Sequence, residues 1–177
     1  MALYIVRHGQ TEENKQMILQ GHMPGTLTAE GTSQVSETAE ELAKTGIKFQ
    51  CIVTSDLKRA KDSAGIIAER LGLQIIPMNI LRERDWGIYT GMTVEEARKT
   101  YRIDGKWVFP DKSAETEEGI RNRAKKALQE LQRLYPTENV IVVTHGQFAR
   151  NMFAVHNNCS YREIPSFVNA EIRILDF

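Results

Sequence analysis

The sequence predicts a three-layer α/β/α sandwich, in which helices cover both faces of a central, largely parallel (mixed) sheet. Short, continuous runs of β-branched residues, of the kind that form strands buried on both faces, recur along the chain. Between them lie longer segments whose apolar residues repeat at helical spacing. This alternation of strands and helices is typical of layered α/β domains. The 177 residues suit one domain, 1–177, and no linker or low-complexity segment divides them.

Four segments are predicted to be strands. The clearest are "LYIV" at 3–6 and "VIVV" at 140–143, which are apolar at every position. "CIVT" at 51–54 and "LQII" at 73–76 have the same character but are less distinct. Because apolar residues dominate all four, we expect strands that are covered on both sides of the sheet.

Four further segments are predicted to be helices, and they are 28–44, 56–71, 93–101 and about 115–134. Gly46 and Gly72 stand just beyond the first two, where glycine commonly ends a helix. The fourth ends before Pro136, which cannot continue a helix. The segment "NILRERDWGIYTGM" after Pro77 has no clear periodicity, and loops of this kind often carry function.

The charge balance excludes partners that need a strong overall field. There are 23 basic and 23 acidic residues, so neither nucleic acid nor an anionic membrane is expected as a partner, and any anion needs a local cluster. Cys51 is expected as a buried thiol and Cys159 in a polar turn, without a disulfide between them. The first residues lack the charged start and apolar stretch of a signal peptide, so we expect a cytoplasmic protein without a membrane span.

Two of the apolar runs end in the same three residues, His-Gly-Gln. They are "LYIVRHGQ", 3–10, and "NVIVVTHGQ", 139–147. With 4 histidines and 12 glycines in the chain, random order would give only about 0.3 His-Gly pairs, so chance is a poor explanation. The alternative for a single pair is a histidine that merely ends a strand and packs beside its glycine.

His8 and His145 would both lie beyond the carboxyl end of a strand, which is where open α/β sheets bind ligands. The glycine after each histidine lets the backbone approach a ligand closely. We expect a helix to start after each pair, with free N–H groups that favour an anion. Arg7 adds a permanent positive charge. The sequence therefore predicts a small anion pocket that contains two imidazoles.

The segment "RHGQTEEN" at 7–14 resembles the signature of the histidine phosphatase superfamily, also called the phosphoglycerate mutase-like family. Further matches follow in the expected order, and they are "QG" at 20–21, "LTAEGTSQ" at 27–34, "TSDLKRAKDSA" at 54–64, "LRERDWGIYTGMT" at 81–93 and "VTHGQ" at 143–147. The segment "VNAEIRIL" at 168–175 resembles the closing strand of the family. The similarity thus covers nearly the whole chain and implies the phosphoglycerate mutase-like fold.

The resemblance also implies a mechanism. His8 would attack phosphorus as a neutral imidazole and form a phosphohistidine. Arg7 and Arg59 would clamp the phosphate, although Arg59 in "DLKRAKD" also suits an exposed position on a helix. His145 would donate to the phosphoryl group during transfer. The resemblance alone implies that four more residues complete the phosphate cradle: Asn14, Gln20, Gly21 and Gly146.

Glu83 is the candidate general acid and base, because a carboxyl group beside a phosphate dianion is pushed towards its protonated form. The alternative for Glu83 is a surface ion pair with Arg82 or Arg84. Three other carboxylates compete for the role: Glu13, Asp85 and Glu115. The two remaining histidines are expected to be structural, His22 in a loop bordering the pocket and His156 near the end of the last helix.

Motifs of other phosphate-handling proteins are missing. The sequence has no G-x-x-x-x-G-K-[ST] loop, no G-x-G-x-x-G fingerprint and no G-x-S-x-G elbow. Neither cysteine is followed six residues later by arginine, and no H-E-x-x-H metal motif is present. We therefore expect catalysis without a metal or another cofactor. The resemblance implies a small phosphorylated metabolite as the substrate.

Two alternatives stay open. Mutases of the family carry a longer insertion after the acid loop, whereas here only about thirty residues separate Glu83 from the helix near Glu115. This favours a phosphatase. Many phosphatase relatives have Gly-Gly-Glu-Ser where this chain has Ala114, Glu115 and Thr116, with Arg123 at the familiar spacing, so the substrate is open. From a different class, the chain could be a non-catalytic phosphate-binding or scaffold protein.

Overall fold

A five-stranded sheet forms the centre of the computed structural model, which describes residues 1–104 and 106–177. Its strands are β1 (Ala2–Arg7), β2 (Phe49–Thr54), β3 (Ile75–Pro77), β6 (Asn139–Thr144) and β7 (Ile172–Asp176). They lie in the order β3-β2-β6-β1-β7. The first four are parallel and β7 runs antiparallel to β1. The predicted largely parallel, mixed sheet is confirmed.

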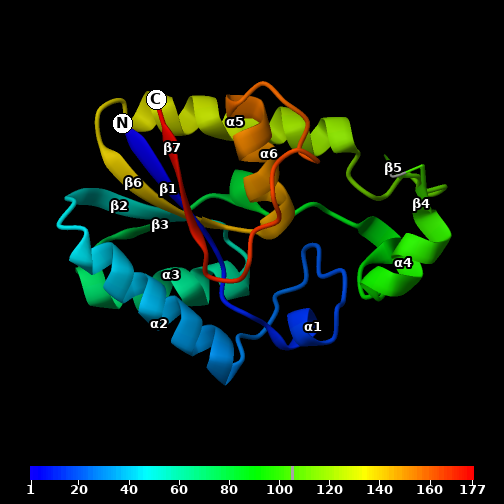
Figure 1. Ribbon diagram of the computed structural model, residues 1–177, viewed down its shortest axis with the longest axis horizontal. Helices are drawn as coiled ribbons and strands as arrows, with labels where there is room; N and C mark the ends of the chain where they lie inside the picture. The colour runs from blue at the N-terminus through cyan, green and yellow to red at the C-terminus, as the bar shows by residue number, and fades with distance from the viewer. Residues whose placement is uncertain (105) are drawn as a thin grey trace.

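Helices cover both faces of this sheet. α2 (Ala29–Lys44) and α3 (Lys58–Leu71) lie on one face, and α5 (Glu117–Leu134) and α6 (Gly146–His156) lie on the other (Figure 1). Successive residues of β1 alternate between two cores: Leu3 and Ile5 face α5 and α6, whereas Tyr4 and Val6 face α2 and α3. The predicted three layers are therefore present. No helix in the described part of the chain is long and apolar enough to cross a membrane.

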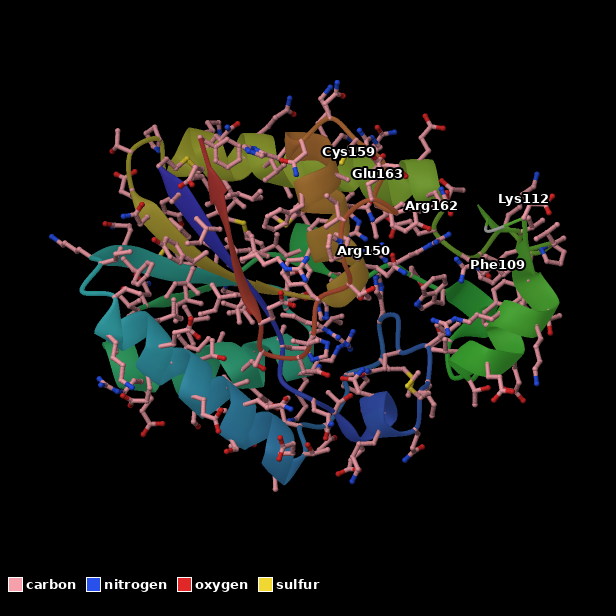
Figure 2. The ribbon with its side chains drawn as sticks, viewed as in Figure 1. Phe109, Lys112, Arg150, Cys159, Arg162 and Glu163 are labelled. Carbon is pink, nitrogen blue, oxygen red and sulfur yellow. The ribbon has the colours of Figure 1, made fainter. Side chains whose placement is uncertain are left out.

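A small lobe built around α4 (Val94–Tyr101) projects from one end of the sheet (Figure 1). It also contains the 3-10 turn η2 (Gly87–Tyr89) and a short hairpin, β4 (Arg102–Ile103) and β5 (Lys106–Trp107). The 3-10 turn η1 (Asn79–Leu81) precedes the lobe and packs on α5. Phe109 lies in this lobe with its ring 4.4 Å from that of Tyr89 (Figure 2). The hairpin was not predicted, because two-residue strands leave no periodic signal.

Several predicted boundaries differ from the structure. The predicted strand 73–76 is wrong in extent, because Gly72 ends α3 in the left-handed region and the N–H of Leu73 still bonds to Ala68. The predicted helix 56–71 starts only at Lys58, because Leu57 is extended. The other three helices begin after capping threonines, which are Thr28, Thr93 and Thr116.

The helix expected after the His8-Gly9 pair is present but begins further along the chain than expected. The chain turns at Gly9 and Gln10, and the four-residue helix α1 (Glu12–Lys15) begins after Thr11. Thr11 and Asn14 form a capping box, in which each side chain accepts the backbone N–H of the other residue. This local pairing fixes the helix start downstream of the histidine. After His145 the expectation is correct, because His145 is the N-cap of α6.

Two glycines bring the segment after His8 into backbone contact with α2. A Cβ atom on Gly31 would lie 2.1 Å from the carbonyl oxygen of Gln10, and one on Gly9 would lie 2.4 Å from that of Gly31. The N–H of Thr28 donates to the same Gln10 carbonyl at 2.9 Å. The first turn of α2 therefore supports the main chain that follows the predicted nucleophile.

We expect Gly31→Ala to lower the free energy of unfolding by about 2 kcal/mol, because the new methyl group must push the 9–10 backbone aside. Gly65→Ala is the matched control, because Gly65 lies inside α3 and a Cβ atom added there would have no neighbour within 4 Å. It should raise the free energy of unfolding by about 0.5–1 kcal/mol. Urea denaturation of both variants measures the difference. Equal stability of Gly31→Ala and wild type would contradict the contact.

Candidate functional site

The predicted site residues surround one cavity at the carboxyl edge of the sheet. The cavity has a volume of about 430 Å³, and seven of the predicted residues line it: Arg7, His8, Asn14, Gln20, Gly21, Arg59 and Glu83. Gly146 lies apart from this set, in an adjoining hollow of about 180 Å³ that Arg7 and Glu83 also line. His145 is fully buried, with its ring centre 5.2 Å from that of His8.

His8 is held so that one ring nitrogen faces the cavity as an acceptor. Its Nδ1–H donates to the carbonyl oxygen of Gly9 at 2.7 Å, which leaves the lone pair on Nε2. Arg59 Nε–H donates to that Nε2 at 3.2 Å. Burial, and then the charges of Arg59 and Arg7, hold the pKa of His8 well below its usual range. The imidazole is therefore neutral at physiological pH.

His145 presents the opposite polarity. The hydroxyl of Ser55, which accepts the N–H of Leu57, lies 2.8 Å from His145 Nε2. We assign this hydroxyl as the donor to Nε2. The neutral ring then carries its own hydrogen on Nδ1. Burial, followed by the charge of Arg59, holds the pKa of His145 well below its usual range. Ser55 was missed in the sequence, although it follows β2 as the histidines follow β1 and β6.

Arg59 is among the most buried side chains, with 1% of its surface exposed. Besides His8, its guanidinium donates to the main-chain carbonyl oxygens of Met23 and Gly21, the latter at 2.9 Å. Burial lowers the pKa of Arg59 to about 10, so the group stays charged at neutral pH. The alternative of an exposed helix arginine does not apply. Gly21, expected to contact phosphate, contacts Arg59 through its carbonyl.

Polar atoms without a partner gather at the same place. Among the described residues, three buried side-chain atoms have no hydrogen-bond partner, and they are Arg7 Nε, Gln20 Oε1 and His145 Nδ1. Arg7 uses Nη1 to donate to the carbonyl oxygen of Phe167 at 2.7 Å, which leaves Nε–H available. Buried donors of this kind are costly unless something accepts from them. Two such donors beside His8 fit the oxygens of an anion.

Glu83 is fixed by backbone amides from two segments. Its carboxylate accepts the N–H groups of Arg84 at 2.9 Å, Gln147 at 3.1 Å and Phe148 at 3.0 Å. The last two belong to the first turn of α6, so the helix N-terminus expected to face a ligand anion binds Glu83 instead. The expectation of a ligand anion at the N-terminus of α6 is therefore wrong. The Glu83 carboxylate nevertheless lines the cavity.

The alternatives considered for the acid loop have other partners in the structure. Arg82 forms a two-bond ion pair with Asp56, and Arg84 Nε donates to the main-chain oxygen of Glu115, so neither pairs with the Glu83 carboxylate. The three competing carboxylates are absent from the residues that line the 430 Å³ cavity. They are Glu13, which accepts from Thr26 at 3.4 Å, Asp85, which accepts from Gly87 at 2.8 Å, and Glu115.

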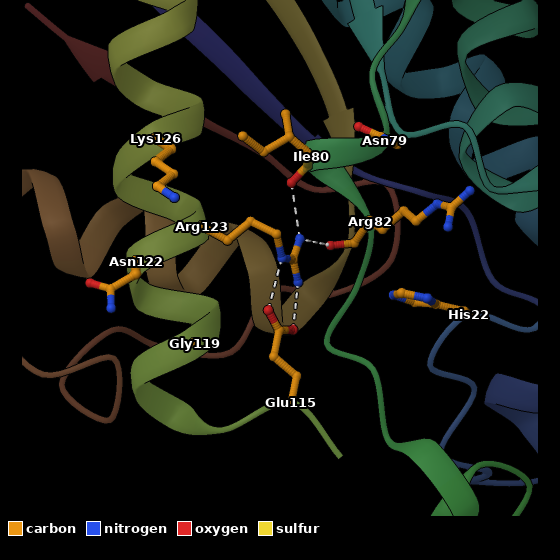
Figure 3. Close-up of a pocket in the computed structure, with 9 residues that line it drawn as sticks. All are labelled: His22, Asn79, Ile80, Arg82, Glu115, Gly119, Asn122, Arg123 and Lys126. Carbon is orange, nitrogen blue, oxygen red and sulfur yellow. Dashed lines mark hydrogen bonds and ion pairs between the residues drawn. The ribbon is translucent and has the colours of Figure 1, made fainter. Parts of the chain in front are cut away.

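Arg123 supports the acid loop from behind (Figure 3). Its guanidinium forms a two-bond pair with Glu115 and donates to the carbonyl oxygens of Ile80, Arg82 and Glu83 at 2.9, 2.6 and 3.2 Å. The main chain of Glu83 is thus held by Arg123 and its carboxylate by α6. The sequence indicated the spacing of Arg123 from Glu115 but not this supporting role.

A second hollow of about 550 Å³ adjoins this support (Figure 3). His22 lines it and lies 3.0 Å from the carbonyl oxygen of Glu83, to which Nε2–H donates. None of the predicted catalytic or substrate-binding residues lines this hollow. His156, also expected to be structural, is exposed at the end of α6 and packs on Phe177.

Asn169 is a further cavity residue, to which the sequence analysis gave no role although it lies in the matched segment at 168–175. Its Nδ2 donates to the main-chain oxygen of His8 at 3.1 Å and to Asn14 Oδ1 at 3.2 Å. It precedes β7 and stands 161 positions after His8 in the chain. Within residues 1–104 and 106–177, no three His, Cys, Asp or Glu side chains gather closely enough to hold a metal ion.

Residues 3–177 match the family described as "Histidine phosphatase superfamily (branch 1)". The "Uncharacterized phosphatase PhoE" of Bacillus subtilis (strain 168) is 39% identical over 145 residues, which span 82% of this chain and 72% of that protein. A 2,3-bisphosphoglycerate-dependent phosphoglycerate mutase from Parvibaculum lavamentivorans is 27% identical over 92% of this chain and 82% of its own length. The solved structure of mycobacterial glucosyl-3-phosphoglycerate phosphatase superimposes with a TM-score of 0.83 at 27% identity, covering 98% of this chain and 88% of that one.

The buried neutral histidines predict a pH dependence of stability. Because the pKa values of His8 and His145 are lowered in the folded state, the unfolded chain binds more protons below about pH 6.5. The free energy of unfolding should then fall, with decreasing pH, by about 1.4 kcal/mol per pH unit for each histidine. Urea denaturation between about pH 7.5 and 5 measures the slope. His145→Gln should lower this slope by the contribution of one histidine. A slope equal to that of wild type would contradict the burial of His145 as a neutral ring.

The Arg123–Glu115 pair can be tested with a double replacement. Arg123→Met leaves a carboxylate with 19% of its side chain exposed and no cation, and should lower the free energy of unfolding by about 3 kcal/mol. Arg123→Met combined with Glu115→Met should cost less than the single change. Arg133→Met is the control, because its pair with Glu130 is exposed and should contribute below about 1 kcal/mol. A double variant less stable than the single one would contradict an ion pair that acts as a unit.

Proposed function

Because the chain belongs to the histidine phosphatase superfamily, we propose that it is a metal-independent phosphomonoesterase that acts through a phosphohistidine on a small phosphorylated metabolite. The chain is a phosphatase. One observation carries the finer proposal: Arg7 Nε and His145 Nδ1, two buried donors without partners, lie beside a neutral His8 whose Nε2 is an acceptor. This arrangement suits a phosphoryl group in contact with a nitrogen nucleophile.

In the first step, the lone pair of His8 Nε2 attacks phosphorus, an N–P bond forms and the P–O bond to the alcohol breaks. Glu83 gives its proton to the leaving oxygen. Arg59 Nε–H, which donates to the same Nε2 in the free enzyme, then donates to an oxygen of the bound phosphoryl group. Arg7 and His145 donate to the other oxygens, where the transition state spreads its charge.

In the second step, water attacks the phosphohistidine and the N–P bond breaks. Glu83, now a carboxylate, takes a proton from the water, so that phosphate leaves and His8 returns to its neutral form. The Gly9 carbonyl keeps the hydrogen of the ring on Nδ1 throughout. The amides of α6 and the support from Arg123 hold Glu83 in place at the cavity wall, which supports its role in both proton transfers.

Hydrolysis is favoured over phosphoryl transfer between two metabolites by the short segment after Glu83. Residues 84–116 supply η2, α4 and the β4–β5 hairpin, and the only arginine that they bring to the described lining of the cavity is Arg98. One cavity is lined by all four of Arg7, His8, Arg59 and Glu83. This set argues against a scaffold protein without activity. We place the enzyme in the cytoplasm, as the sequence suggests, with no nucleic acid or membrane as a partner.

The decisive experiment is hydrolysis of a phosphomonoester panel with phosphoenzyme trapping on the best substrate. His8→Ala should reduce kcat/KM by about a thousandfold or more and abolish an acid-labile phosphoenzyme. His156→Gln is the control, because this exposed histidine lies outside the cavity. Addition of a chelator of divalent ions should leave the rate unchanged.

Each alternative has its own result in this assay. Activity of His8→Ala equal to wild type would exclude His8 as the nucleophile, and loss of activity with the chelator would exclude metal independence. Transfer of a phosphoryl group from a bisphosphoglycerate to a monophosphoglycerate, in place of release as phosphate, would establish the mutase alternative. No hydrolysis across the panel would favour the phosphate-binding alternative.

A further inference from the structure

A third arginine reaches the catalytic cavity from the α4 lobe. Arg98 lines the cavity together with Arg7 and Arg59, but those two come from the sheet side and take part in the proposed chemistry. Val94, one helical turn before Arg98, lines the cavity as well, so this face of α4 forms part of its wall. The lining of the cavity thus includes residues of α4, whose lobe projects from one end of the sheet (Figure 1).

The acidic residues of α4 do not neutralise Arg98. Glu95 forms an ion pair with Lys99 at 2.6 Å. The Glu96 carboxylate accepts the N–H and the hydroxyl of Thr93, at 3.1 and 2.7 Å, and so caps the helix. In the described part of the chain, no hydrogen bond or ion pair engages the Arg98 side chain. An exposed cation at a cavity wall is therefore available to a ligand.

Backbone bonds fix α4 relative to the rest of the cavity. Ile18 and Thr93 form an antiparallel bridge, and on either side of it the N–H of Leu19 donates to Met92 and that of Val94 to Met17. These bonds, at 2.9 and 2.7 Å, attach the start of α4 to the loop that lines the cavity. Arg98 therefore has a defined place instead of moving with a free lobe.

Apolar side chains form the part of the wall next to Arg98, whereas Gln147, Ser166 and Asn169 line it elsewhere. The apolar residues are Met17, Ile18, Leu19, Trp86 and Val94. Met17 is exposed over 58% of its surface, and its backbone lies in the left-handed region at φ 56°, which is uncommon for a residue other than glycine. A volume of about 430 Å³ is in the range of pockets that hold whole small-molecule ligands, so it has room for more than a phosphoryl group.

We infer that Arg98 binds an oxyanion on the leaving-group side of the substrate, so that the enzyme prefers phosphomonoesters whose apolar alcohol part ends in a carboxylate or a second phosphate. This inference rests on the proposed function of the same site. The transferred phosphate would bind Arg7 and Arg59, the apolar part would contact the wall, and the terminal oxyanion would accept hydrogen bonds from the Arg98 guanidinium.

The proposed role of Arg98 can be tested with three esters that have the same leaving oxygen. They are hexyl phosphate, its analogue with a terminal carboxylate, and the hexane bisphosphate. Wild type should show kcat/KM about fivefold higher for at least one anionic ester than for hexyl phosphate at low salt. Arg98→Gln should bring this ratio to about one, and Arg98→Glu should bring it below one. Added salt should lower the wild-type ratio, because the charge is exposed.

Lys112→Gln is the matched control, since it removes one positive charge at the outer edge of the same lobe, away from the cavity lining (Figure 2). Its ratio should equal that of wild type. A wild-type ratio of one, or an Arg98→Gln ratio equal to wild type, would overturn the inference. An equal loss on all three esters would show only structural damage and would also overturn it.

Failure of this inference is distinguishable from failure of the proposed function. Hydrolysis of hexyl phosphate without an Arg98-dependent preference would overturn the inference alone. If wild type hydrolyses none of the esters, the proposed function fails. Dissociation constants of the matching phosphonates, measured by titration calorimetry in wild type and Arg98→Gln, would then show the preference as a binding ratio or overturn it.

Discussion

The candidate site depends on guanidinium groups that are held by main-chain carbonyl oxygens instead of carboxylates. Arg7 donates to Phe167 and Arg59 donates to Met23 and Gly21. A carbonyl group satisfies an N–H without cancelling the positive charge, and no ion pair of the described residues includes either arginine. The fold therefore keeps two charges at a buried place, and an anionic ligand is the group that compensates them best. Burial of the same cluster also keeps both histidines neutral.

Arg123 differs from Arg7 and Arg59 because it has a carboxylate partner as well as carbonyl partners. It too binds carbonyl oxygens, but Glu115 pairs with it on its other side. Its charge is compensated within the protein, and it serves to support the loop that carries Glu83. Arg7 and Arg59 line the 430 Å³ cavity together with Glu83, whereas Arg123 lines the separate 550 Å³ hollow. In the proposed chemistry, Arg7 and Arg59 bind the phosphoryl group with charges that no carboxylate compensates. Arg123, whose charge Glu115 compensates, holds the loop that carries Glu83, the residue proposed to transfer protons.

The sequence predicted the layers and the main constellation because both depend on local patterns. The apolar runs before His8 and His145 predict the strands, and the carboxyl ends of these strands predict where the cavity lies. Long-range contacts could not be predicted in this way. The turn at residues 9–10, which delays the helix expected after His8, could not be predicted, because Gly31, which packs against this turn, lies on another element. The sequence predicts a ligand anion at the first turn of α6, where the structure has the Glu83 carboxylate. This contact could not be predicted, because Glu83 lies in a loop without periodicity. The roles assigned to single residues stay predictions.

Strand β7 has a consequence for the way the protein folds. It pairs with β1, and the residues just before it supply contacts to the site, namely the Phe167 carbonyl to Arg7 and the Asn169 amide to His8. These partners stand 160 and 161 positions apart along the chain. Contacts between such distant positions form only when both ends of the chain have been brought together. The phosphate site thus needs the last residues of the chain as much as the first, and a chain whose β7 is unpaired lacks part of the site.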